Sequence, residues 1–205
     1  MRGKLRLERN YQLLNEHVPR KGDVLDLGCG YGFASYMLAL TSPQRNITGI
    51  DYDQEKIRVA DGGFLKSPRI TFLAADIRTF GFSPKDCIIL GDVLHYIQPS
   101  DQEQLLLKCM SNLREGGKII IRDADKDHTS VHSRSRLTEW FSTGMKFNKT
   151  YDETLSLHFI STAGIQRIAS GAGFSLEVIG LKAYSSNTYY LLQKTSNTNK
   201  ANEPL

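Results

Sequence analysis

The sequence predicts an α/β fold: a doubly wound, mostly parallel seven-stranded sheet with helices on both faces and an antiparallel hairpin at the C-terminal end. Three observations carry this prediction. Short apolar segments alternate along the chain with segments of helical pattern, an order typical of parallel sheets with crossover helices. A glycine-rich turn, Gly28 to Gly32, joins the first strand of this alternation to its first helix. Two final strands, 174–180 and 187–193, are joined by so short a link that they must run antiparallel.

The individual elements follow from periodicity and from residues that end helices. Residues 5–17 place apolar side chains on one face of a helix, which Pro19 to Gly22 end. In the helix 100–114, Ser100 and Glu103 have the spacing of a capping box, and a stripe made by Leu105, Leu106, Cys109, Met110 and Leu113 faces the core. The other predicted elements are strands 23–27, 46–50, 70–74, 86–91 and 117–122 and helices 33–41, 53–61 and 161–172.

The 205 residues have the length of one domain, which we place at 1–194. Residues 124–160 interrupt the alternation with a polar, irregular segment that begins at the carboxyl end of a predicted central strand. Since a long loop inside a compact domain commonly has a function, we expect a substrate-cap insertion here, with Trp140, Phe141 and Phe147 as an apolar pocket. A surface excursion without a role is the alternative. Residues 195–205 are polar and are predicted to form a disordered tail.

Composition disfavours several classes of protein. Hydrophobic residues make up 40% of the chain, the formal net charge is +4, and no apolar run approaches the roughly 20 residues that span a bilayer. We find no pattern of a signal peptide. The cysteines, Cys29, Cys87 and Cys109, form no C-x-x-C pair, which argues against a disulfide framework and fits a cytoplasmic protein. A basic N-terminal run is interpreted as a solvated helix face rather than a nucleic-acid or membrane patch.

The stretch DVLDLGCGYG, residues 23–32, has the pattern of a ligand-binding turn. A short apolar strand leads into glycines at 28, 30 and 32, and a helix follows, so its free N–H groups face whatever lies over the turn. Asp26 can accept a hydrogen bond from an ammonium group. Asp51, after the second strand, stands where a βαβ unit places a carboxylate against ribose hydroxyls. The alternative is a tight turn without a ligand.

The same residues resemble the class I S-adenosylmethionine (SAM)-dependent methyltransferases. VLDLGCGYG resembles motif I of that family, and GIDYD at 49–53 resembles the acidic motif after its second strand. AADI at 74–77, DCIILGDVLHYI at 86–97 and LREGGKIIIRD at 113–123 resemble its later motifs. The resemblance covers nearly the whole chain. It implies a Rossmann-like methyltransferase fold, SAM as the cofactor and methyl transfer as the activity.

The predicted SAM contacts combine this resemblance with the residues at the strand ends. The glycine turn would take the methionyl part, Asp51 both ribose hydroxyls, and Asp76 the adenine amino group. A helix or turn cap is the alternative role for Asp76, and Asp53 is expected to be the N-cap of the following helix. The complete set of predicted cofactor contacts is Asp26, Gly28, Cys29, Gly30, Gly32, Asp51, Tyr52, Asp76, Ile77, Gly91 and Asp92.

Histidines are the candidates for a general base, which a hydroxyl acceptor needs more than a carbon acceptor. His95 follows the fourth strand, near the expected reaction centre, and packing is its alternative role. His128 and His132 lie in the segment 124–160, where they would orient or deprotonate an acceptor. Two histidines without a third nearby ligand do not predict a metal site. His158, in the apolar run LSLHFI, is expected to be a core residue.

The predicted function is methyl transfer from SAM to a small-molecule or lipid-like acceptor, at oxygen or carbon. GDVLHY at 91–96 is not the Asn/Asp-Pro-Pro-aromatic motif of enzymes that methylate exocyclic base nitrogens, so nucleic acid is a disfavoured acceptor. A non-catalytic SAM-fold partner or regulatory protein is the main alternative. A nicotinamide (NAD)-dependent oxidoreductase is disfavoured by the terminal hairpin and by Phe33, which stands where a dinucleotide fingerprint has its last small residue.

Overall fold

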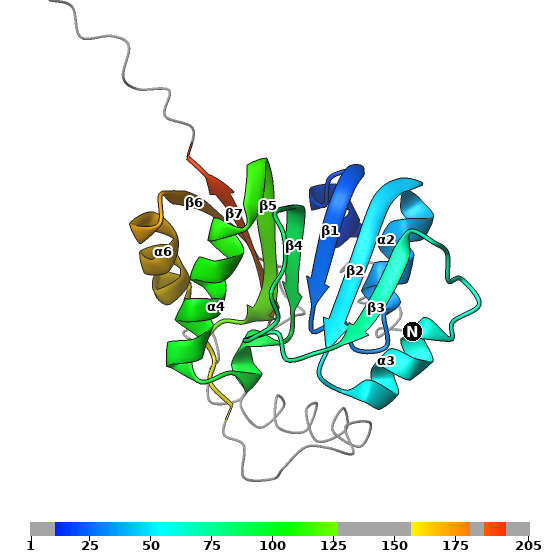
Figure 1. The fold of residues 1–205 in the computed structure, drawn as a ribbon. Coiled ribbons are helices and arrows are strands. Elements are labelled where there is room, and N and C mark those ends of the chain that lie inside the picture. The colour runs from blue at the N-terminus through cyan, green and yellow to red at the C-terminus, as the bar shows by residue number, and fades with distance from the viewer. Residues whose placement is uncertain (1–10, 127–156, 181–186, 196–205) are drawn as a thin grey trace, which may run out of the picture.

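One seven-stranded sheet organises residues 11–126, 157–180 and 187–195, the part of the chain that the computed structural model describes (Figure 1). The strands are β1 (Lys21–Leu27), β2 (Gln44–Asp51), β3 (Ile70–Ala74), β4 (Lys85–Gly91), β5 (Leu113–Ala124), β6 (Phe174–Gly180) and β7 (Asn187–Lys194). Their order is β3-β2-β1-β4-β5-β7-β6. The paired strands are parallel, except that β7 runs antiparallel to both β5 and β6. The predicted fold class is therefore confirmed.

Helices cover both faces of this sheet (Figure 1). One face carries α2 (Phe33–Thr41), α3 (Gln54–Asp61) and the helical residues 11–17, and the other carries α4 (Pro99–Ser111) and α6 (Thr162–Gly171). A short 3-10 helix, η1 (Leu94–Tyr96), follows β4. The strand order reverses between β1 and β4, because β2 continues the sheet on one side of β1 and β4 continues it on the other.

The core lies in two layers, one on each face of the sheet, because side chains alternate along each strand. In β4, Cys87 and Ile89 face the α2 side, whereas Ile88 and Leu90 face the α4 side. Both Cys87 and Cys109 are fully buried, as a role in the core requires. The near-continuous apolar runs of the central strands are thus explained by burial on both faces.

The capping box predicted for α4 is wrong. Gln98 is the N-cap residue, and it makes no side-chain cap hydrogen bond. Pro99 begins the helix, since its fixed φ suits the first helical position. Glu103 instead pairs with Arg167 of α6 at 2.8 Å. The helix therefore starts one residue earlier than the pattern indicated.

The predicted end of α4 is also corrected. The helix ends at Ser111, and the side chain of Asn112 donates to the carbonyl oxygen of Lys108 at 2.9 Å. Leu113 already belongs to β5, where it pairs with Lys85 across an irregularity of register. Four of the five predicted stripe residues are buried, and the fifth, Leu113, packs against the same cluster from the strand.

Arg45 ties the helical residues 11–17 to the sheet. Its side chain is fully buried at the start of β2. It donates to the carbonyl oxygens of Val18, Pro19 and Leu38 at 2.8–2.9 Å, and to the Asn15 side chain at 2.8 Å. Burial lowers the pKa of Arg45. One guanidinium thus satisfies the end of the N-terminal helix and the last turn of α2.

The predicted substrate cap is described only at its two ends. Ala124 forms a small cluster with Leu157 and Phe159, and the N–H of Lys126 donates to the carbonyl oxygen of Ile160 at 3.3 Å. The five cap residues proposed from the sequence lie outside the described residues: His128, His132, Trp140, Phe141 and Phe147. After β7, the N–H of Thr195 donates to the carbonyl oxygen of Gly173. Residues 196–205 also lie outside the described residues.

Candidate cofactor site and active site

The turn between β1 and α2 is held by hydrogen bonds to β2. The N–H groups of Gly28 and Cys29 both donate to the carbonyl oxygen of Ile50, at 2.8 and 3.0 Å. Gly28, Gly30 and Gly32 have φ angles of 79°, 55° and 74°, in the left-handed region that favours glycine. The alternating glycines therefore set the path of the turn.

The three glycines are required for different reasons. A Cβ atom at Gly28 would lie 2.6 Å from Val93, and one at Gly32 would lie 2.5 Å from Phe72. A Cβ atom at Gly30 would meet nothing within 4 Å. Gly28 and Gly32 are needed for packing inside the protein, whereas Gly30 borders open space where a ligand can approach the backbone.

Asp51 supports this turn from the end of β2. Its carboxylate, 7% exposed, accepts the N–H of Gly30 at 2.9 Å through Oδ2 and the N–H of Asp53 at 3.0 Å through Oδ1. Asp53 accepts two backbone N–H groups of the first turn of α3, which confirms it as the N-cap. Tyr52 is 58% exposed between them. Asp51 thus couples the glycine turn to the loop after β2.

Asp26 is the second-last residue of β1, just before the glycine turn, and its carboxyl group is buried. Only 3% of the residue is exposed, and Oδ2 accepts the hydroxyl of Ser35 at 2.6 Å. Burial raises the pKa of Asp26 to about 6; Ser35 and Arg122 act against this, and the charge of Asp51 adds to it. A cationic ligand group beside it would restore the charged form.

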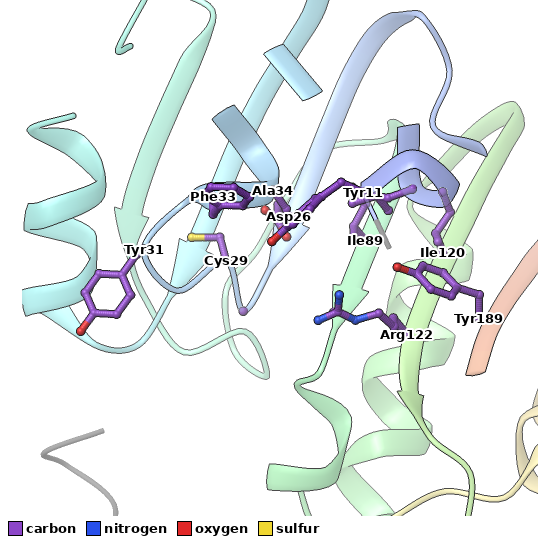
Figure 2. A pocket seen from close by; sticks show the side chains of 13 residues that line it. Tyr11, Asp26, Cys29, Tyr31, Phe33, Ala34, Ile89, Ile120, Arg122 and Tyr189 are labelled. Atoms are coloured by element: carbon purple, nitrogen blue, oxygen red, sulfur yellow. The ribbon is translucent and has the colours of Figure 1, made fainter. Parts of the chain in front are cut away.

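A cavity of about 210 Å³ lies where the strand order reverses between β1 and β4 (Figure 2). The glycine turn and the start of α2 form one side, the sheet forms the floor, and the helical residues 11–17 lie over it. The structure brings Asp26, Gly28, Cys29 and Gly91 together in its lining. Ligands of doubly wound sheets bind at such a switch point, beyond the carboxyl ends of the strands. The remaining predicted cofactor contacts lie outside this lining.

Arg122, which the sequence analysis did not assign, also lines the cavity. It lies near the end of β5, opposite Gly91 in the register of β4 and β5. Its Nε donates to Oδ1 of Asp92 at 3.2 Å, and its Nη2 pairs with Oδ2. The predicted contact Asp92 therefore holds an arginine in the cavity wall. The signal was present, since Arg122 is two residues from Ile120 and so points to the same face.

Asp76 lies after β3 and has the capping role that was its alternative. Its Oδ1 accepts the N–H of Arg78 at 2.9 Å, and its carboxylate pairs with the guanidinium of the same residue at 2.6 Å. The Arg78 side chain accordingly lowers the pKa of Asp76. Ile77 is buried beneath this turn. A contact of Asp76 or Ile77 with adenine stays a prediction.

His95 is buried beside the end of β5. Its Nδ1 lies 2.7 Å from Oδ1 of Asp123, and its backbone N–H donates to Oδ2 of the same carboxylate at 3.2 Å. An ionised Asp123 requires the Nδ1–H tautomer, which leaves Nε2 as the basic nitrogen. The ring is 5.3 Å from that of Phe159. His158 is partly buried rather than in the core, and its backbone N–H donates to the carbonyl oxygen of His95 at 2.8 Å.

The buried carboxyl group of Asp26 predicts a pH-dependent difference in stability between Asp26→Asn and the original protein. The folded-state pKa of about 6 exceeds the unfolded value, so the free energy of unfolding falls as pH rises from about 4 to 7. The asparagine variant lacks this penalty. We expect the variant to gain up to about 3 kcal/mol relative to the original protein at neutral pH, and almost nothing at ~pH 4.

Urea unfolding of the two proteins across this pH range measures the difference. Ser35→Ala tests the same assignment from the other direction, because it keeps the titrating group but removes a hydrogen bond that lowers its pKa, so the loss of stability with rising pH should become larger. A stability difference that does not grow as pH rises contradicts the assignment of a raised pKa to Asp26.

Part of this chain is similar to known proteins. Residues 24–117 match the family model described as a methyltransferase domain. A carboxy-S-adenosyl-L-methionine synthase of Desulfotalea psychrophila is 27% identical over 133 residues, covering 62% of this chain and 54% of that protein. A trans-aconitate 2-methyltransferase of Azoarcus sp. is 31% identical over 100 residues, covering 48% of this chain and 38% of that protein. The chain thus spans about half the length, or less, of these curated relatives.

A solved structure supports the fold along most of the chain. Magnesium protoporphyrin IX methyltransferase from Synechocystis PCC 6803, with bound S-adenosylhomocysteine (SAH), has a TM-score of 0.67 at 19% identity. The match covers 94% of this chain and 84% of that one. The fold is doubly wound, and its cavity lies at the switch point where ligands bind in proteins of this architecture. Residues 24–117 are thus similar to a methyltransferase domain, which supports the resemblance to the class I SAM-dependent methyltransferases.

Among the described helices, none is long and apolar enough to cross a membrane. Within residues 11–126, 157–180 and 187–195, no group of three or more histidine, cysteine or acidic side chains is arranged to hold a metal ion.

Proposed function

We propose that this protein transfers the methyl group of SAM to a small-molecule acceptor, at oxygen or carbon. The cavity at the switch point carries the proposal, because Asp26 and Gly91 line it near the ends of β1 and β4, and a Cβ atom at Gly91 would meet nothing within 4 Å. The relative named trans-aconitate 2-methyltransferase supports an acceptor of this size. A lipid-like acceptor, also expected from the sequence, is the alternative.

The residues of the chain fit SAM at three points. Asp26 would bind the ammonium group, which compensates a carboxylate that burial otherwise disfavours. Gly30 would allow the cofactor to lie against the backbone, and Asp51 would accept the ribose hydroxyls through oxygens that are already oriented by the turn. Bound SAM supplies an activated methyl group, so the protein's task is mainly alignment.

For an acceptor that must lose a proton, His95 is the described candidate base. Asp123 fixes its orientation and would stabilise the imidazolium that forms. The His95 side chain is 2% exposed, so an acceptor would have to displace its aromatic neighbours to reach Nε2. His128 and His132 remain predicted alternatives within the proposed cap.

A direct assay tests the function. Purified protein is incubated with SAM and a panel of small hydroxy and carboxylic acids, phenols and fatty acids, and SAH formation is followed by mass spectrometry. Stabilisation against heat by SAM and SAH but not by NADH separates a methyltransferase from an oxidoreductase; a ligand at 100 times its Kd adds about 2.7 kcal/mol. SAM binding without turnover on any acceptor or cell extract would favour the non-catalytic alternative.

A second candidate follows from the relatives named carboxy-S-adenosyl-L-methionine synthase, one of which aligns with 62% of this chain. Such a protein would replace one hydrogen of SAM by a carboxyl group, which a second, carboxylic-acid substrate gives up in exchange for that hydrogen, and no SAH would form. The same mass spectra distinguish the two reactions, because one yields SAH and a methylated acceptor, and the other yields SAM enlarged by a carboxyl group.

The ribose contact gives a prediction for binding. Asp51→Ala is expected to weaken SAH affinity by at least about tenfold, because it removes charge-assisted hydrogen bonds. Titration calorimetry on the folded variant measures this loss. Asp53→Ala is the matched control: it removes a carboxylate from the same loop and costs about 1 kcal/mol of stability through the lost N-cap, but should leave SAH affinity unchanged. Equal affinity in Asp51→Ala would rule out the ribose assignment.

A further inference from the structure

Arg122 is a feature of the cavity that alignment of SAM by the glycine turn does not explain. Its guanidinium points into the cavity from the end of β5, and the Tyr189 side chain reaches the same region from β7 (Figure 2). The neighbouring lining from the sheet is apolar, formed by Ile89 and Ile120. A cation among apolar side chains is unfavourable unless oxygen atoms satisfy its donors.

Asp92 orients this guanidinium by binding one of its edges, the edge made by Nε and Nη2. The backbone supports the pair, since the N–H of Asp92 donates to the carbonyl oxygen of Arg122 at 2.7 Å. Asp92 is the only non-glycine with positive φ among the described residues, at 55°. Aspartate is among the few non-glycine residues that adopt this conformation readily, and in it the Asp92 carboxylate contacts Arg122.

The second edge of the guanidinium carries Nη1, and a guanidinium has donors on both edges. The Tyr189 hydroxyl belongs to the same group of polar atoms: burial raises its pKa, while the charge of Arg122 and a hydrogen bond to it act in the opposite direction. Tyr11, whose pKa is also raised by burial, lines the cavity from the helical residues above. Two neutral phenols and an arginine fork are donors of the kind that carboxylates bind.

We infer that Arg122, with Tyr11 and Tyr189, forms a carboxylate-binding subsite of this cavity. The inference rests on the proposed function for the identity of its ligand. The carboxylate belongs either to the amino-acid end of SAM or to the acceptor. In the first case, Asp26 binds the ammonium and Arg122 the carboxylate of one zwitterion. In the second case, Arg122 selects acidic acceptors.

The experiment compares two ligands that differ only in the carboxylate. Titration calorimetry is done with SAH and with decarboxylated SAH, S-adenosyl-3-thiopropylamine, on the original protein and on Arg122→Gln. Malonate and succinate are then titrated into the free and the SAH-saturated proteins. Arg114→Gln is the matched control, because Arg114 lies on the same strand but pairs with Asp23 and Asp86 instead of lining the cavity.

Two results support the subsite and separate its sources. If the donor carboxylate binds there, the original protein prefers SAH to its decarboxylated analogue by about tenfold or more, and Arg122→Gln loses this preference. If the acceptor carboxylate binds there, SAH affinity is unchanged in the variant, but its affinity for a dicarboxylate falls by about tenfold. Arg114→Gln should behave as the original protein in both titrations.

Other results overturn the subsite. If Arg122→Gln binds SAH, its analogue and the dicarboxylates as the original protein does, Arg122 has only a structural role. Should Arg122→Gln fail to fold, Tyr189→Phe removes one hydroxyl and must reduce the same carboxylate-dependent affinity. A protein that binds no SAH refutes the proposed function, and the dicarboxylate titration of the free protein, with and without Arg122, still decides the subsite.

Discussion

Replacing Gly30 by valine is expected to abolish binding of SAM and SAH while leaving the protein folded. The added side chain meets no protein atom within 4 Å of its Cβ, so it would occupy the open space beside the turn. The backbone at φ 55° would be strained by an L-residue, at a cost of roughly 1–2 kcal/mol. The added side chain would therefore take the space of the ligand, while the free energy of unfolding falls only modestly.

Gly173 offers a matched control for this experiment. It has φ 76°, its Cβ would also meet nothing within 4 Å, and it lies between α6 and β6 rather than in the turn between β1 and α2. Gly173→Val should lower the free energy of unfolding by a similar amount and bind SAH normally. Urea unfolding of both variants measures the cost of the strained backbone, and calorimetry with SAH measures whether the added side chain obstructs the ligand. If Gly30→Val binds SAH as Gly173→Val does, the glycine turn has only a structural role.

The sequence revealed this turn because its determinants are local. A short apolar strand, glycines at alternate positions and an acid after the next strand are all visible within about one βαβ unit. Asp26, Gly28 and Cys29 were predicted on that basis, and Gly91 was predicted from its place at the end of the fourth strand, in a stretch that resembles a later motif of the family. All four share one cavity in the structure. The seven strands were predicted for the same reason, since period and turn chemistry are read from neighbouring residues.

The features that were missed depend on contacts between distant segments. Arg122 stood in a quoted motif, but its neighbour Asp92 is 30 residues away, and only the register of β4 and β5 brings them together. The pairing of His95 with Asp123 likewise joins residues 28 positions apart, one after the end of β4 and the other near the end of β5. The predicted start of α4 was wrong for a local reason. Pro99 favours the first position of the helix, so the helix begins there and Ser100 does not become its N-cap.

Arg45 is the residue for which sequence gave least warning and the structure predicts the largest loss of stability. It directly precedes the predicted strand 46–50, a position that does not suggest burial. In the structure, its guanidinium is buried against carbonyl oxygens from two helix ends. Arg45→Met would keep a chain of similar length but leave these acceptors without donors. Each buried unsatisfied acceptor costs about 1–3 kcal/mol, so we expect a total loss of roughly 3–5 kcal/mol.

The same substitution should weaken ligand binding indirectly, because Arg45 anchors the residues that follow Tyr11 and Leu14, and both of these line the cavity. Urea unfolding measures the stability, and calorimetry with SAH at low denaturant measures the affinity. Arg69→Met is the control, since Arg69 donates to the carbonyl oxygens of Ser42 and Arg45 but is only partly buried, and it should cost under about 1 kcal/mol. Equal losses in the two variants would mean that the buried guanidinium does not hold the N-terminal helix over the cavity.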